Sequence, residues 1–331
     1  MGARAMSYGD LIKDAFRITL RNRFLWFFGF FAGSALFNFP LGVGNFDTDD
    51  FEQSGAGPSA LATQFGPGAL DNAALIVGSV VVVLLVVLLF MVMSIISQGA
   101  LSESVAAIDR GEGRRFGFTF QAGLSNCWRV LGYYILFFLI AVGLLVAIGI
   151  PIALLIGGTF AATQSTGARV TVAVLAGLVG VVLLVLIFLP LHIISQYALR
   201  EIVVRQARVF GSVGSGYEVF RRNLGQSLLL WLINVLLMIG VGIALLVVVV
   251  LVGFVLFIPT IALALAEYTS TAMVAGVMAG VILLPILLGA SGAAGTFRHA
   301  YWTLAYLRLT ALSETAPTGT ALPPDSSPAL G

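Results

Sequence analysis

Charged residues are scarce in this chain: they make up 10% of its 331 residues, whereas hydrophobic residues make up 59%. Soluble domains carry roughly 25% charged residues and cannot hide this much apolar surface from water. The apolar residues also occur in runs longer than the ~18 residues needed to cross about 30 Å of hydrocarbon. The composition therefore excludes a soluble protein and predicts an all-α polytopic membrane protein.

The chain also has few residues that could bind a metal or carry out catalysis. Its single cysteine, Cys127, excludes an internal disulfide and a cysteine-built metal site. The only histidines are His192 and His299, and no Asp or Glu stands in the middle of an apolar run, so a proton relay lacks partners. We find no nucleophile–base pair, no phosphate-binding loop and no zinc motif. The sequence therefore predicts no catalytic residue, no cofactor and no metal, and it predicts that His192 is an ordinary interfacial histidine.

One short stretch occurs twice and organises the chain. Residues 95–101 read IISQGAL and residues 193–199 read IISQYAL; each copy ends an apolar run and opens a basic segment. An amphipathic segment followed by a helical hairpin fits three times along the sequence. We therefore predict six transmembrane helices as three repeated hairpins with interfacial amphipathic helices. The expected spans are about 24–43, 73–97, 128–157, 170–196, 226–259 and 271–304, in a membrane domain over 7–310 between an N-terminal tail (1–6) and a disordered C-terminal tail (311–331).

Basic residues concentrate in alternate connections between these spans. The other connections hold mostly acidic residues, with Arg169 as the exception. The positive-inside rule then predicts a protein of the prokaryotic inner (cell) membrane with both termini in the cytoplasm. The acid-rich segment 44–72 is expected to be an external loop, with a calcium site as the less favoured alternative. The basic residues that decide the orientation are Arg4, Lys13, Arg17, Arg21, Arg23, Arg110, Arg114, Arg115, Arg129, Arg200, Arg205, Arg208, Arg221, Arg222, Arg298 and Arg308.

Two amphipathic segments precede predicted spans. In Ser7–Leu20, apolar residues recur at helical spacing with charges on the other face. A similar stripe surrounds Tyr217 and Phe220. We predict that both lie against the inner leaflet and that the helix direction changes sharply at Asn22 and at Asn223 with Gly225. The alternatives are a cytoplasmic helix packed on the bundle for Ser7–Leu20 and, for both segments, a straight continuation of the span that follows. The residues predicted to contact lipid or a partner are Lys13, Arg17, Arg21, Arg221 and Arg222.

The repeated stretch places a glutamine at equivalent positions, Gln98 and Gln196. Two such side chains can hydrogen-bond between helices, which contributes about 0.6–2 kcal/mol. They can equally line a small polar cavity. We favour the interhelical pair as the interpretation.

The architecture resembles a group of six-span prokaryotic membrane proteins and is similar to the membrane domain attached to some glycerophosphodiester phosphodiesterases. The resemblance rests on degenerate motifs over about residues 7–310. It implies a membrane module without the catalytic barrel, and no catalytic residue carries over. The motifs are Asp14-Ala15-Phe16-Arg17, Phe24-Leu25-Trp26, Ser195-Gln196-Tyr197-Ala198-Leu199-Arg200, Tyr217-Glu218-Val219-Phe220-Arg221-Arg222-Asn223 and Tyr301-Trp302-Thr303-Leu304-Ala305-Tyr306.

These observations favour a non-enzymatic membrane module, either a scaffold or a lipid-contacting accessory of an envelope process. Its expected partners are membrane lipid and either another protein or a second copy of the chain, with no role for nucleic acid. A transporter of small molecules or lipids is the alternative, because repeats and proline-interrupted helices are typical of transporters. A water-filled, polar-lined cavity that reaches the bilayer midplane would favour transport, and a dry centre packed with Leu, Val and Gly would favour the scaffold.

Overall fold

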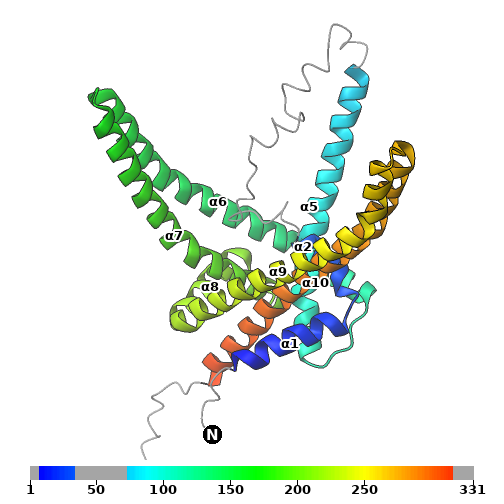
Figure 1. The fold of residues 1–331 in the computed structure, drawn as a ribbon. Helices are drawn as coiled ribbons and strands as arrows, with labels where there is room; N and C mark the ends of the chain where they lie inside the picture. The colour runs from blue at the N-terminus through cyan, green and yellow to red at the C-terminus, as the bar shows by residue number, and fades with distance from the viewer. Residues whose placement is uncertain (1–6, 34–72, 316–331) are drawn as a thin grey trace, which may run out of the picture.

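The structure is a computed structural model that describes residues 7–33 and 73–315 (Figure 1). The regular structure in these two ranges is entirely helical. Five helices, α5, α6, α7, α9 and α10, are long and apolar enough to cross a membrane. The helices are α1 (Tyr8–Arg21), α2 (Leu25–Gly33), α5 (Ala73–Asp109), α6 (Phe116–Ala162), α7 (Thr166–Val204), α8 (Val209–Arg222), α9 (Leu224–Leu265) and α10 (Thr269–Thr315).

The predicted all-helical membrane architecture is thus confirmed for five candidate spans. The first predicted span, 24–43, begins with α2, and its residues 34–43 lie outside the described ranges. The predicted acidic loop 44–72 and the tail from residue 316 lie outside them as well. The number six and the threefold repetition stay predictions.

The long helices continue well past the predicted ends of the spans. Residues 98–127 were expected to form an interior connection, but α5 runs to Asp109 and α6 already begins at Phe116. With 47 residues, α6 is about 70 Å long at 1.5 Å per residue, more than twice the thickness of the hydrocarbon. Charged residues therefore mark the end of the predicted membrane-spanning part of a helix, but they do not mark the end of the helix. Similarly, α10 continues to Thr315, beyond the predicted end of the domain.

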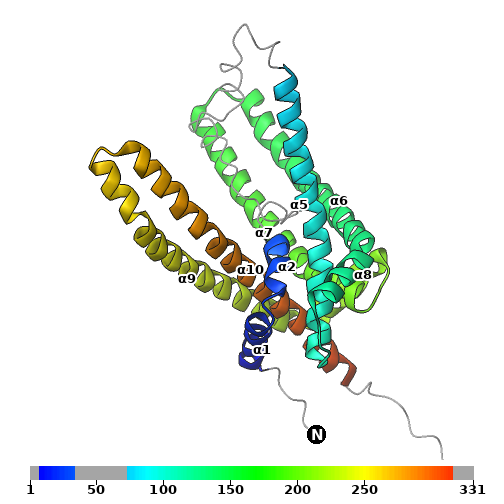
Figure 2. The ribbon, with the colours of Figure 1, turned by 90° about the vertical axis from the view of Figure 1, so that its right-hand side faces the viewer.

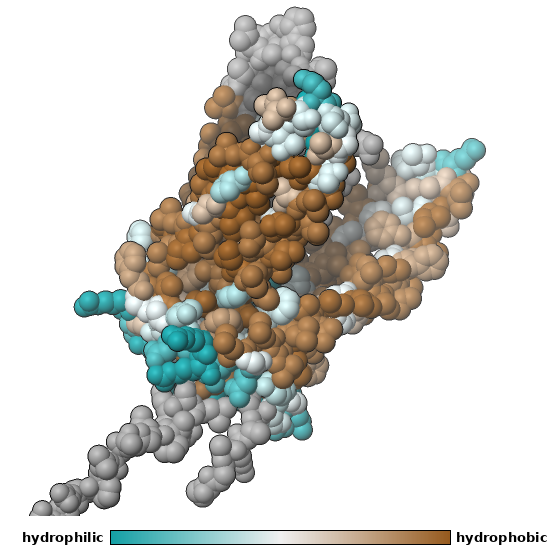
Figure 3. All heavy atoms as spheres, turned by 90° about the vertical axis from the view of Figure 1, so that its left-hand side faces the viewer, coloured by the Kyte–Doolittle hydropathy of each residue, from teal (hydrophilic) through white to brown (hydrophobic). Residues whose placement is uncertain are grey.

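The molecule has a packed base and two diverging arms. The arms are the outer parts of the α6–α7 and α9–α10 hairpins, residues 139–187 and 239–291, which separate from each other toward the top of Figures 1 and 2. The base consists of α1, α2, α8 and the ends of the long helices nearest to them. The large hydrophobic core cluster lies in the base. Polar residues gather at the lower end of the face seen in Figure 3 and at the hairpin tips, and a broad apolar surface lies between them.

The base is held together by close backbone packing between α2 and α10. A Cβ atom added at Gly29 would collide with the Gly292 carbonyl and with Thr296, and one added at Gly295 would collide with the Gly29 carbonyl. The Thr296 hydroxyl donates to the Leu25 carbonyl at 2.9 Å. Small residues permit this approach between membrane helices, where packing and hydrogen bonds replace the hydrophobic effect as the driving force.

Both amphipathic helices end at the predicted asparagines. The Ser7 hydroxyl accepts from the Asp10 amide at the start of α1, and the Asn22 side-chain amide donates to the Ile18 carbonyl at 3.0 Å at its end. The Asn223 side-chain amide likewise donates to the Val219 carbonyl at 3.1 Å after α8. In Figure 1, α2 turns away from the direction of α1. Uninterrupted helices through Asn22 and Asn223 are therefore excluded, while the position of α1 and α8 at a leaflet stays a prediction.

Arg169, the exception in the charge pattern, has a local structural role. Its guanidinium donates to the Thr163 carbonyl at 2.7 Å and to the Phe160 carbonyl at 2.9 Å. These carbonyls belong to the last turn of α6 and to its C-cap residue, where backbone acceptors lack helical partners and favour a cation. The residue thus stabilises the tip of the α6–α7 hairpin.

Candidate functional site

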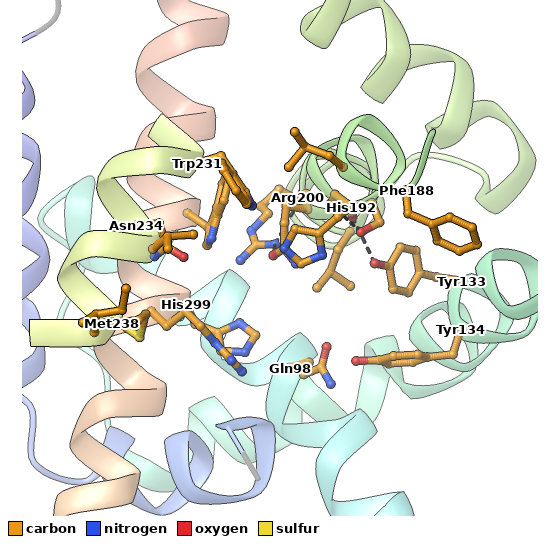
Figure 4. A pocket seen from close by; sticks show the side chains of 18 of the residues that line it. Gln98, Tyr133, Tyr134, Phe188, His192, Arg200, Trp231, Asn234, Met238 and His299 are labelled. Atoms are coloured by element: carbon orange, nitrogen blue, oxygen red, sulfur yellow. Dashed lines mark hydrogen bonds between the residues drawn. The ribbon is translucent and has the colours of Figure 1, made fainter. Parts of the chain in front are cut away.

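A cavity of about 890 Å³ lies where the arms meet the base. Side chains from α5, α6, α7, α9 and α10 converge on it (Figure 4). Its volume falls in the upper part of the ~300–1,000 Å³ range of small-molecule sites. The polar and aromatic lining residues are Gln98, Tyr133, Tyr134, His192, Ser195, Gln196, Arg200, Trp231, Asn234, Arg298, His299 and Trp302.

Arg200 is the central feature of the cavity. It is 0% exposed, and its Nη1 donates to the backbone and side-chain oxygens of Gln196 at 2.8 and 2.7 Å. Its Nε and Nη2 have no hydrogen-bond partner among the described residues. Removing a charged group from water costs several kcal/mol, and this cost is normally offset by an opposite charge. Arg200 therefore places a buried positive charge at the cavity wall, and no acidic residue among the described lining residues offsets it.

Helix α10 brings a second arginine to the cavity. Arg298 Nη2 donates to the Ala32 carbonyl of α2 at 3.3 Å. Its neighbour His299 is 6% exposed, and its Nδ1 has no partner in the described part of the chain. His192 lines the cavity from α7, on the side of Arg200, while His299 and Gln98 lie across from them in Figure 4.

The cavity has no acidic counterpart to these cations. Across residues 7–33 and 73–315, no Asp or Glu side chain lines it. Nor does this part of the chain contain a group of three His, Cys, Asp or Glu residues that could hold a metal ion. The charge and the donor atoms together suit an anion rather than a cation.

Neutral donors complete the polar wall. Asn234 of α9 is 7% exposed, and its Nδ2 has no partner among the described residues. The Tyr133 hydroxyl donates to the Ser195 carbonyl at 3.0 Å, which joins α6 to α7 beside Arg200 (Figure 4). The Tyr134 hydroxyl points toward Gln98 in the same view. These contacts fix the helices whose side chains form the site.

Helical spacing explains how α7 supplies three groups to one wall. His192, Gln196 and Arg200 are separated by four residues each, and residues four apart lie on the same face of a helix. The same spacing puts Arg298 and Trp302 on one face of α10. The sequence predicts which residues share one face of α7 or of α10, but it does not predict that these two faces meet across the cavity.

Of the predicted site residues, only the two glutamines reach the cavity. Gln98 and Gln196 both line it, although the hydrogen bond shown for Gln196 is the one with Arg200 within α7. The basic residues of the amphipathic helices lie elsewhere and are exposed; these are Lys13, Arg17, Arg21, Arg221 and Arg222. Two of those arginines pair locally, Arg17 with Asp14 at 3.5 Å and Arg222 with Glu218 at 2.6 Å.

Sequence reasoning missed the cavity itself. The sequence leaves a small polar cavity open only for Gln98 and Gln196, whereas the structure also brings Arg200, Arg298, His192, His299 and Asn234 together there. The arginines were treated as ends of spans that determine orientation. The available signal was the i, i+4, i+8 series in α7 together with an arginine inside the predicted span 271–304, since ionisable residues within membrane helices usually face the protein interior.

A family model matches most of the chain. Residues 10–315 match the family described as "Family of unknown function (DUF7544)". The chain belongs to this family. The DUF7544 match includes α2 and every helix that lines the cavity. All residues that line the cavity therefore lie within the part of the chain that matches the family. No curated protein and no solved structure matches the chain.

Proposed function

We propose that this DUF7544 protein is a non-enzymatic module of the cell membrane that binds an anion in the cavity between its base and its arms. The observation that carries the proposal is the buried Arg200 guanidinium: its Nε and Nη2 have no partner among the described residues, and it lines a cavity without an acidic lining residue in the described chain. A guanidinium offers a planar array of donors that matches phosphate and carboxylate oxygens. Arg298 adds a second positive charge.

The orientation proposed from the sequence puts this site on the cytoplasmic side of the membrane. The base carries most of the basic residues, and positive residues favour the cytoplasmic face. Under the same proposal the chain has six spans in three repeated hairpins. The resemblance to membrane domains of glycerophosphodiester phosphodiesterases stays part of the proposal for the membrane scaffold alone, because it carries over no catalytic residue.

The proposal is tested by the thermal stability of the purified full chain in detergent with sodium phosphate or sodium chloride at matched ionic strength. A ligand that binds only the folded state stabilises it by about 2.7 kcal/mol at 100 times its dissociation constant. We expect phosphate to raise the unfolding temperature of the natural protein. The Arg298→Gln variant should lose this response, and Arg298→Lys should keep part of it.

The matched control is Arg222→Gln, because Arg222 is exposed on α8 and does not line the cavity. Phosphate also stabilises proteins nonspecifically by being excluded from their surface, and this effect should be equal in all variants. An identical phosphate response in Arg298→Gln and Arg222→Gln would contradict the proposed anion site.

Transport of the bound anion is the second candidate function. It is favoured by the position of the cavity at the point where the two hairpins diverge. Uptake of labelled phosphate into proteoliposomes that depends on Arg298 would support transport. Phosphate binding without uptake would support the accessory module.

A further inference from the structure

The lining of the cavity changes from polar to apolar along two helices. On α7 the polar residues lie toward the base, ending at Arg200, and the apolar residues Val185, Phe188 and Leu189 lie toward the arm. On α9 the polar Asn234 is followed outward by Met238 and Ile239. From Arg200 to Val185 the wall extends about 22 Å along α7 at 1.5 Å per residue. The site therefore has a charged inner end and a long apolar outer end.

The apolar end of the cavity is open to the surroundings of the arms. Val185 is 59% exposed and Ile239 is 53% exposed. Helices α7 and α9 make little direct contact with each other in the described chain, consistent with the divergence seen in Figures 1 and 2. In a bilayer, exposed apolar side chains at this level face acyl chains.

We infer that the ligand is a net-negative phospholipid whose phosphate binds at Arg200 and Arg298, and whose acyl chain lies along the apolar walls of α7 and α9. This inference rests on the proposed anion site and names the class of its ligand. A free phosphate would use only the inner end of a cavity of about 890 Å³. A phospholipid matches both ends, and it reaches the cavity sideways from the bilayer between the diverging arms.

The headgroup determines selectivity in this arrangement. Moving an acyl chain from bilayer to apolar protein surface changes little free energy, because lipid tails are as apolar as leucine. Charge-assisted hydrogen bonds from the guanidinium groups distinguish an anionic headgroup from a zwitterionic one. The apolar walls admit the chain, and the arginines select the lipid.

The test is lipid retention by the full chain reconstituted in phosphatidylcholine nanodiscs that contain phosphatidylglycerol, measured by native mass spectrometry. We expect preferential retention of phosphatidylglycerol. The double variant Val185→Trp with Ile239→Trp, which fills the apolar walls, should reduce this retention by about tenfold or more. It should keep the thermal response to inorganic phosphate, whereas Arg298→Gln should lose both.

The matched control is Ile243→Trp, because Ile243 is an exposed residue of α9 one turn farther out and does not line the cavity. Unchanged lipid retention in the Trp double variant would overturn the lipid assignment. The same result is expected if another part of this chain, and not a lipid, occupies the apolar walls. Equal retention of phosphatidylglycerol and phosphatidylcholine by the natural protein would also overturn it. In both cases the phosphate response still reports separately on the anion site.

A second measurement needs no substitution in the walls. Of the four tryptophans, Trp231 and Trp302 line the cavity. In a variant that combines Trp26→Phe with Trp128→Phe, the tryptophan fluorescence therefore comes only from residues of the site. Brominated phosphatidylglycerol should quench its fluorescence more strongly than brominated phosphatidylcholine at the same content. Equal quenching would contradict the inference even if the wall variants failed to fold.

Discussion

The base and the arms of this molecule are stabilised in different ways. In the base, Ala305 and Tyr306 of α10 are 0% exposed and belong to the core cluster. In the arms, Leu178 of α7 is 61% exposed and Leu246 of α9 is 62% exposed. An apolar surface of this extent is compatible with lipid and not with water. The arms have local contacts within each hairpin, as where Gly180 of α7 packs closely on Ile152 of α6, whereas the base joins helices from both hairpins through one core cluster.

The contrast explains where the cavity lies. Positioning buried donors such as those of Arg200 requires several helices that are fixed relative to one another, and the core cluster of the base provides this. The apolar end of the site requires helices that are separated from each other and accessible from the bilayer, and the diverging arms provide this separation. The binding site is expected at the junction because each half supplies one of its two properties.

The largest expected difference between the halves comes from glycine substitution. Gly29→Leu should separate α2 from α10, because even a Cβ atom there meets backbone. We expect a loss of about 3 kcal/mol or more, or failure to yield folded protein. The control is Gly242→Leu in the α9–α10 arm, where nothing lies within 4 Å of an added Cβ. Thermal unfolding monitored by size-exclusion chromatography should show no loss for this variant; equal loss in both would refute the distinction between base and arms.

A smaller effect is expected from one buried hydrogen bond. The Tyr301 hydroxyl donates to the Leu230 carbonyl at 2.9 Å and joins α10 to α9 in the base. Tyr301→Phe should lower the free energy of unfolding by about 0.5–1.5 kcal/mol. Tyr268→Phe, at the exposed tip of the α9–α10 arm, should have no effect in the same denaturation experiment. A larger loss at Tyr268 than at Tyr301 would reverse the comparison.

The smallest effect is expected at an exposed turn of the base. Glu112, between α5 and α6, accepts from Arg110 at 2.8 Å and from Arg114 at 3.2 Å. The hydrogen bond from Arg110, with the nearby positive charges, lowers the pKa of the Glu112 carboxyl. A lowered pKa in the folded state means that the stabilisation is present above the ordinary carboxyl pKa and is lost as the pH falls through the folded value.

The Glu112→Gln variant should therefore be slightly less stable than the natural protein at neutral pH and equally stable in acid. Unfolding temperatures across this range provide the measurement, and high salt should reduce the difference. A difference that grows as the pH falls would contradict the assignment of the carboxylate as the stabilising form.

The sequence predicts what depends on local order. Apolar runs located the five long helices, and Asn22 and Asn223 located the ends of α1 and α8, because capping and hydrophobicity act within a few residues. The true lengths were missed where charges were taken as the end of a helix, as after Gln98 in α5. The residues after Gln98, up to Asp109, can form a helix whether they lie inside or outside the membrane, so their polarity does not show where the helix ends.

The site could be predicted only in part. Gln98 and Gln196 were identified through the repeated stretch, and both line the cavity. Arg200 and Arg298 were recognised as basic residues, but their meeting depends on the tertiary arrangement of α7 and α10. No local pattern specifies which helix faces face each other, so the cavity became visible only with the fold.

The contact between α2 and α10 has a consequence for biosynthesis. The hydrogen bond between Leu25 and Thr296 joins residues that are 271 positions apart along the chain. At the usual ~5–20 residues per second of synthesis, the ribosome takes on the order of 15–50 s to add the partner of α2 after α2 itself. During that interval the glycine surface of α2 has no α10 to pack against. A chain interrupted before α10 would keep this surface uncovered, which gives cellular quality control a simple physical mark of an unfinished protein.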